Sequence, residues 1–96
     1  MSYRDSSPWT DKTELMCLLI FKKLQSEDFP RGKQKKYCEK MAENTGLTFN
    51  TINAKVGNYK SVAGIINKSN YSKNTVNIYN KYGHLPIYDI ELLITT

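Results

Sequence analysis

The chain has 96 residues, a length that allows one domain with a single core and is too short for two independent ones. A hydrophobic share of 40% and an aromatic share of 11% exclude a typical disordered chain. Lys and Arg outnumber Asp and Glu by 14 to 9, which favours a polyanionic partner, although many small proteins are equally basic for solubility alone.

The N-terminal part predicts a flexible arm followed by a helix. Met1 to Pro8 is polar and has no signal-peptide core, and the longest apolar run, Leu15 to Phe21, is too short to span a membrane. We therefore expect a cytoplasmic protein with a flexible arm over residues 1–8 and a single helical domain over 9–96. Thr10 is suited to cap a helix over Asp11–Gln25. Its wide apolar face contains Leu15, Leu18 and Leu19.

A second, amphipathic helix is predicted over Lys33–Asn44. Phe29 and Pro30 stop the first helix and leave a short connection. The second helix has a narrow apolar stripe formed by Tyr37, Cys38, Met41 and Ala42. The two cysteines, Cys17 and Cys38, have no further ligands in metal spacing, so we expect reduced thiols in the core.

The third predicted helix follows the second after a very short turn. Gly46 suits a left-handed residue at the end of a helix, and Thr48 suits an N-cap. The apolar positions of this helix recur at helical spacing and comprise Phe49, Ile52, Val56 and Tyr59. The unit from Lys36 to Tyr59 therefore has the form of a helix-turn-helix.

The spacing around Gly46 agrees in part with the helix-turn-helix used for DNA binding. Ala42, Leu47 and Ile52 occupy the positions that need a small crossing residue and apolar wedges. Thr45 and Lys55 fall where apolar residues are usual, although Val56 beside Lys55 is suited to the same place. Short helix-turn-helix units also occur in bundles that bind no DNA, so this spacing mainly indicates fold.

The C-terminal third predicts one further helix and a last short element. Residues Ile65 to Tyr71 indicate a loop, and a fourth helix is expected over Ser72–Lys81 with Gly83 as its C-cap. Residues Ile87 to Ile94 predict either one or two turns of helix or a strand. Their apolar side chains also suit a dimer surface. The expected fold class is all-α, with four to five short helices around one core.

The third helix carries an unusual number of compact hydrogen-bonding residues. They are Thr48, Asn50, Thr51, Asn53, Lys55 and Asn58. An Asn side chain can form two hydrogen bonds with adenine. Asn and Thr lower the stability of a helix, and no structural gain is obvious here. Such residues are nevertheless also tolerated at solvent-exposed positions. We expect Asn50, Thr51 and Asn53 to enter the major groove of double-stranded DNA. The phosphates would be held by Lys33, Lys36, Lys55 and Lys60.

Catalysis is not expected from this sequence. His84 is the only histidine, there is no Gly-rich phosphate loop, and the acidic residues are dispersed. We predict no enzyme activity, no metal site and no cofactor.

Several short motifs resemble a known family. They are Trp9-Thr10, Glu14-Leu15, the run from Thr48 to Val62, the stretch from Gly64 to Asn70, and the aromatic helix around Tyr79. This set resembles the N-terminal domain of bacterial HNH-type restriction endonucleases, in which an Asn-Phe pair corresponds to Asn58-Tyr59. The resemblance implies recognition of modified or foreign DNA. A single helix-turn-helix usually gains specificity by dimerising or by belonging to a larger protein, so a homodimer or part of a larger nuclease is expected. It implies no catalysis here, because an HNH site needs paired histidines and a metal.

A protein-interaction module is the alternative from a different class. A small basic helical domain also suits a phage or mobile-element protein that regulates or inhibits a host enzyme without direct DNA contact. Binding of duplex DNA at two salt concentrations separates the two hypotheses.

Overall fold

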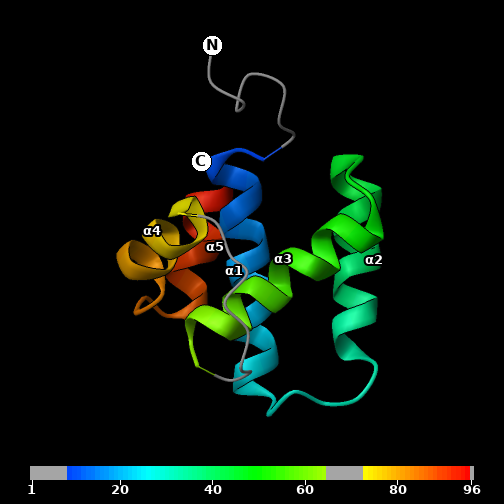
Figure 1. The fold of residues 1–96 in the computed structure, drawn as a ribbon, viewed down its shortest axis with the longest axis horizontal. Coiled ribbons are helices and arrows are strands. Elements are labelled where there is room, and N and C mark those ends of the chain that lie inside the picture. The colour runs from blue at the N-terminus through cyan, green and yellow to red at the C-terminus, as the bar shows by residue number, and fades with distance from the viewer. Residues whose placement is uncertain (1–8, 65–72, 96) are drawn as a thin grey trace.

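The structure is a computed structural model that describes residues 9–64 and 73–95. Over this part of the chain it consists of helices alone, without a strand, which confirms the all-α class. The helices are α1 (Asp11–Ser26), α2 (Lys33–Thr45), α3 (Phe49–Val62), α4 (Lys73–Tyr82) and α5 (Ile87–Thr95). Helix α1 is the central element, since it packs against each of the other four (Figure 1).

The first helix begins where its capping residues predict. The Thr10 side chain accepts a hydrogen bond from the backbone N–H of Thr13 at 3.2 Å, and the Thr13 hydroxyl oxygen accepts one from the N–H of Thr10 at 2.8 Å. This reciprocal pair satisfies backbone donors that the first turn of a helix leaves without partners. The helix then continues to Ser26, one residue beyond the prediction. The arm predicted over residues 1–8 lies outside the described residues.

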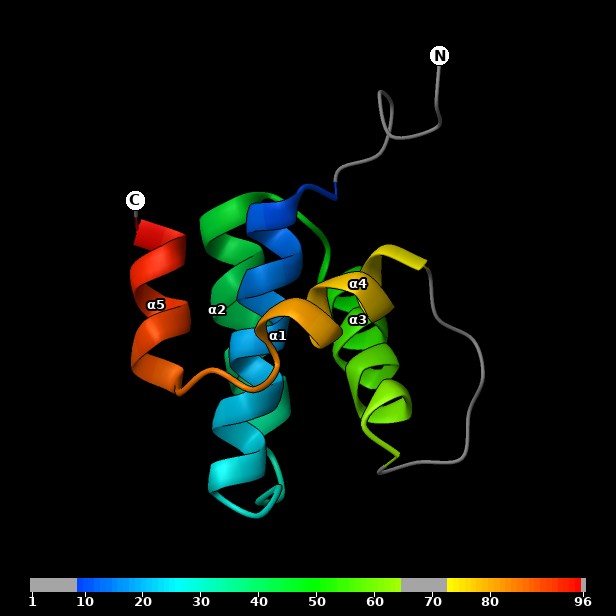
Figure 2. The same cartoon turned by 90° about the vertical axis from the view of Figure 1, so that its left-hand side faces the viewer.

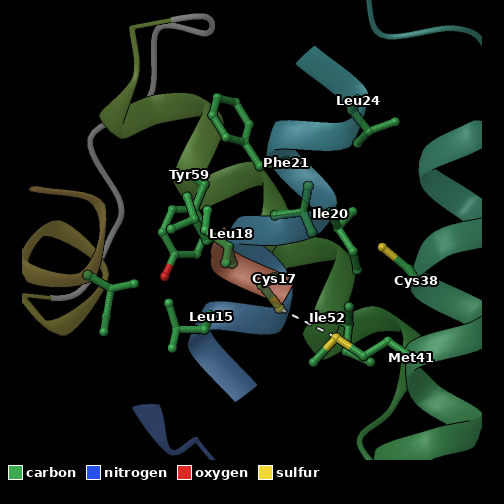
Figure 3. Close-up of a cluster of buried hydrophobic side chains, with 13 residues drawn as sticks. Leu15, Cys17, Leu18, Ile20, Phe21, Leu24, Cys38, Met41, Ile52 and Tyr59 are labelled. Atoms are coloured by element: carbon green, nitrogen blue, oxygen red, sulfur yellow. Dashed lines mark hydrogen bonds between the residues drawn. The ribbon is translucent and has the colours of Figure 1, made fainter. Parts of the chain in front are cut away.

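The core forms around the apolar face of α1. Its members are Leu15, Cys17, Leu18, Ile20, Phe21, Leu24, Cys38, Met41, Ile52, Val56, Tyr59, Ile78 and Ile90. Figure 3 shows that α1, α2 and α3 all contribute to it, with the thiol of Cys17 3.8 Å from the sulfur of Met41. Both cysteines are buried free thiols, as expected. Burial raises the pKa of Cys17 above its ordinary value and that of Cys38 to about 11.

Only three residues separate α2 from α3. Gly46 has a φ of 80° and ends α2, and its N–H donates to the carbonyl of Ala42 at 3.0 Å. Glycine adopts this left-handed conformation without the steric cost that other residues incur. Thr48 then caps α3, because its hydroxyl oxygen accepts from the N–H of Thr51 at 3.2 Å. The short turn between the second and third helices is thus confirmed.

The C-terminal third is helical throughout its described part. Helix α4 runs from Lys73 to Tyr82, whereas the predicted start at Ser72 and the predicted loop over Ile65–Tyr71 lie outside the described residues. Residues from Ile87 onward form a helix, which settles the alternative between helix and strand. The turn between α4 and α5 is tied to the central helix, since the Lys22 ammonium donates to the carbonyl of Gly83 at 2.6 Å.

The position of Gly83 leaves no room for a side chain. Its N–H donates to the carbonyl of Tyr79 at 2.7 Å, and a Cβ added to Gly83 would collide with that same carbonyl oxygen. We expect Gly83→Ala to lower the free energy of unfolding by roughly 1–3 kcal/mol, measured by urea denaturation. Gly57→Ala is the matched control, because nothing lies within 4 Å of its added Cβ. That variant should gain roughly 0.5–1 kcal/mol, and equal effects at both sites would contradict this explanation.

Candidate nucleic-acid interface

Helix α3 has one buried face and, from Asn50 to Asn58, an open face on the opposite side; farther along that side Ser61 is buried. Ile52, Val56 and Tyr59 are fully buried, and the helical period places Asn50 and Ala54 on the opposite side, where both are exposed. The next residues on this outer side, Gly57 and Asn58, are partly exposed. All the side chains on the outer face are short, which lets another macromolecule approach the helix closely.

The first turn of α3 is held by two threonines. Thr48 and Thr51 join through their hydroxyls at 2.8 Å, in addition to the cap that Thr48 provides. Asn50 is exposed between them. The helix cap thus accounts for both threonines, whereas Asn50 presents its amide to solvent.

The structure gives Asn53 and Lys60 a packing role between α2 and α3. The amide of Gln34 on α2 donates to the side-chain oxygen of Asn53 at 2.7 Å and accepts from the Lys60 ammonium at 2.5 Å. Lys60 also lies over the ring of Phe29, 5.3 Å from its centroid. Both predicted site residues are partly buried. An asparagine in this helix therefore has a structural use, which weakens Asn53 as a residue that reads bases.

Lys55 does not fit the phosphate contact predicted for it. Lys55 is only 8% exposed, and its ammonium lies 3.1 Å from the carboxylate of Glu14. The ammonium also donates to the hydroxyl of Thr75 at 3.2 Å and lies 4.8 Å from the centroid of the Trp9 ring. A buried and paired ammonium is not available to a ligand at the surface, so we correct this assignment. Lys55 stabilises the fold from inside.

Glu14 is the centre of a buried polar cluster that the sequence analysis missed. Glu14 is 1% exposed, and its carboxylate accepts hydrogen bonds from the Tyr59 hydroxyl at 2.7 Å and the Thr75 hydroxyl at 3.3 Å. The cluster of Glu14, Lys55, Tyr59 and Thr75 joins α1, α3 and α4. Burial, followed by the nearby carboxylate and its hydrogen bond, raises the pKa of Tyr59 above its ordinary value.

A sequence signal for this cluster does exist. Glu14 precedes Leu18 by four residues, and Lys55 follows Ile52 by three and precedes Tyr59 by four. Both charged residues therefore occupy positions on the apolar face of their helices. One carboxylate and one ammonium at such positions predict a buried pair.

The predicted basic residues of α2 do not lie beside the open face of α3. The Lys33 ammonium is 5.8 Å from the centroid of the Tyr37 ring, on the side of α2 that faces α1. Lys36 is exposed, and the helical period places it opposite the buried Cys38 and Met41. The structure thus separates Lys33 and Lys36 from Asn50 and Asn58.

The positive charge of the chain is concentrated in its α3 and α4 half. No acidic residue occurs between Glu43 and Asp89, whereas this stretch contains five lysines. The nine basic residues elsewhere are balanced by nine acidic ones, so this stretch supplies the whole net charge of +5. In α4, which packs beside α3, the exposed residues are Lys73, Asn77, Asn80 and Lys81. Asparagine is thus exposed on both helices, and α4 adds two exposed lysines.

Comparison with known protein families, characterised proteins and solved structures finds no match to this chain. The resemblance to the N-terminal domain of HNH-type endonucleases therefore stays a prediction. Among the described residues, no group of three or more His, Cys, Asp or Glu side chains is arranged to hold a metal ion. No helix of the described part is long and apolar enough to cross a membrane.

Proposed function

We propose that this domain binds double-stranded DNA through the open face of α3 and the adjacent exposed residues of α4. The observation that carries this proposal is the distribution of charge, because α3 and α4 contain no acidic residue and belong to the stretch that supplies all the net positive charge. Lys73 and Lys81 are the exposed lysines among the described residues of this stretch, so they are the charges that attract polyanionic DNA. No carboxylate on these two helices repels it.

The open face of α3 has the chemistry needed to read bases. The major groove admits an α-helix, and an Asn side chain can bond the N6 and N7 atoms of adenine together. Asn50 and Asn58 lie toward the outer side of α3 and are exposed or partly exposed. The short residues Ala54 and Gly57 between them allow close contact with the groove. Lys73 and Lys81 are then suited to hold the phosphates on the α4 side.

A titration of labelled duplexes of random sequence tests this proposal. We compare two double variants that change the net charge equally, Lys73→Glu/Lys81→Glu on α4 and Lys33→Glu/Lys36→Glu on α2; all four side chains are exposed. Fluorescence anisotropy at about 50 mM and about 200 mM salt gives the affinity and its salt dependence. The α4 pair should lose at least about tenfold in affinity and lower the log–log salt slope by about 2. The α2 pair should lose distinctly less.

Two results would contradict the proposed interface. The absence of binding at the lower salt concentration excludes DNA as the partner. A greater loss from the α2 pair than from the α4 pair places the DNA on the side of Lys33 and Lys36, as the sequence alone had suggested. The double variant Asn50→Ala/Asn58→Ala separates base reading from phosphate contact, since it should reduce selectivity among the retained sequences while the salt slope stays the same.

A link to restriction or defence is part of this proposal and depends on the resemblance described above. Duplex pools with and without cytosine modification, sequenced after retention, test it directly. Enrichment of one pool supports recognition that is sensitive to modification, and equal retention limits the proposal to unmodified sequence.

A further inference from the structure

Helix α5 has an uncovered apolar face. Among the described helices it packs substantially against α1 alone, through Ile90 and its neighbours. Tyr88, Leu92 and Leu93 are 68%, 47% and 42% exposed, and they are the large hydrophobic residues that the described surface exposes. Apolar side chains gathered on one short helix are a common mark of an interface.

A groove lies beside this helix, between α1, α2 and α5. It contains a hollow of about 230 Å³ whose apolar lining includes Met16, Leu19, Met41 and Ile94. A second hollow adjoins the first and shares Met16, Asn44 and Ile94 with it. Ile94 of α5 lines both hollows, so the groove lies beside the helix that carries the exposed Tyr88 and Leu92. The groove lies away from α3, since Figure 2 shows α3 and α5 on opposite sides of α1.

The charges around the groove and on α5 are complementary. Every charged residue that lines the two hollows is a lysine, and these residues are Lys12, Lys23 and Lys40. The only charged residues of α5 are Asp89 and Glu91. One such pair already forms within the chain, because Lys23 and Glu91 lie 3.7 Å apart. The remaining Lys12 and Lys40 are exposed, and Asp89 is partly exposed.

We propose that a second copy of this chain binds at the groove, with α5 of each copy docked into the groove of the other. A two-fold arrangement covers both apolar surfaces at once, because each copy supplies one α5 and one groove. The carboxylates of the docked helix then meet the lysines at the rim, which favours this helix over a basic one. The inference does not depend on DNA binding, although a dimer of this kind presents two α3 helices to a duplex, as many dimeric DNA-binding domains do.

Sedimentation velocity of the full chain, without DNA, tests the dimer. Between about 5 µM and about 500 µM the weight-average mass should rise from 11.1 kDa toward twice that value. Leu92→Glu should keep the chain monomeric over this range, and Lys40→Glu should weaken association by about tenfold. Lys35→Glu is the matched control, since Lys35 is an exposed lysine of α2 that does not line the groove. Circular dichroism and the Tm verify that each variant is folded.

Two outcomes would overturn the proposal. A chain that stays monomeric at the highest concentration excludes the second copy as the occupant and leaves the groove to a helix of another protein. A dimer that persists in Leu92→Glu uses a different surface.

Repeating the DNA titration with Leu92→Glu distinguishes the dimer proposal from the DNA-binding proposal. A monomeric variant that still binds DNA supports both, whereas an unmodified chain that dimerises without binding DNA supports the dimer and contradicts the DNA proposal.

Discussion

Glu14→Ala is expected to lower the free energy of unfolding by roughly 3–5 kcal/mol, because it leaves the buried ammonium of Lys55 without its carboxylate. The Tyr59 hydroxyl, which donates to that carboxylate at 2.7 Å, loses its partner as well. Small domains have a total stability of about 5–15 kcal/mol, so this variant should be close to unfolding at room temperature. Urea denaturation followed by circular dichroism measures the loss.

Two further variants control this result. Asp11→Ala removes an acidic residue from the same first turn of α1, but Asp11 is exposed, so its loss should cost no more than about 1 kcal/mol. The double variant Glu14→Leu/Lys55→Met replaces the pair with apolar side chains and should recover much of the stability. If Glu14→Ala costs no more than Asp11→Ala, the carboxylate is not the buried partner of Lys55.

Raising the pH above 9 is expected to lower the free energy of unfolding progressively. The pKa of Cys17 is raised above its ordinary value of 9.0, that of Cys38 from 9.0 to about 11, and that of Tyr59 above 10.0, in each case chiefly by burial. Below pH 9 both the folded and the unfolded chain keep these protons, so the contribution to stability is complete. Above it, the unfolded chain releases protons that the folded chain retains, and stability falls. Each such group raises the unfolding equilibrium constant about tenfold per pH unit.

The midpoint of urea denaturation, measured from about pH 7 to about pH 11, checks this prediction. The variant Cys17→Ala/Cys38→Ala should move the onset of the decline from about pH 9 to about pH 10, where Tyr59 begins to contribute. Tyr59→Phe should leave the onset unchanged and reduce the slope above pH 10, relative to its own lower stability at neutral pH. A midpoint that stays constant up to pH 10 would show that the thiols are open to solvent.

Local signals in the sequence account for most of the fold. Thr10, Gly46 and Thr48 act through hydrogen bonds and backbone angles within a few residues. The start of α1, the end of α2 and the start of α3 therefore follow from the local sequence. The last helix was less certain, because a short apolar segment suits a buried helix or a strand equally well. Packing against α1 decides in favour of the helix.

The candidate site was harder to predict, since it depends on how each helix is rotated about its axis. Lys55 and Asn53 both looked available for DNA, yet their partners, Glu14 and Gln34, lie far away in sequence. The sequence shows which residues are polar, but only the packed fold shows which of them already form hydrogen bonds or ion pairs within the protein. The absence of acidic residues between Glu43 and Asp89 can be read from the sequence. The helix-turn-helix pattern alone does not reveal it.

The buried pair of Glu14 and Lys55 also fixes the orientation of α3. If α3 rotated about its axis, the Lys55 ammonium would move away from the Glu14 carboxylate. At least one of the two charges would then be buried without its partner, which is unfavourable. The outer positions Asn50, Ala54 and Asn58 are not part of this buried ion pair. They can therefore be varied together in a combinatorial library without disturbing the buried pair that orients the helix.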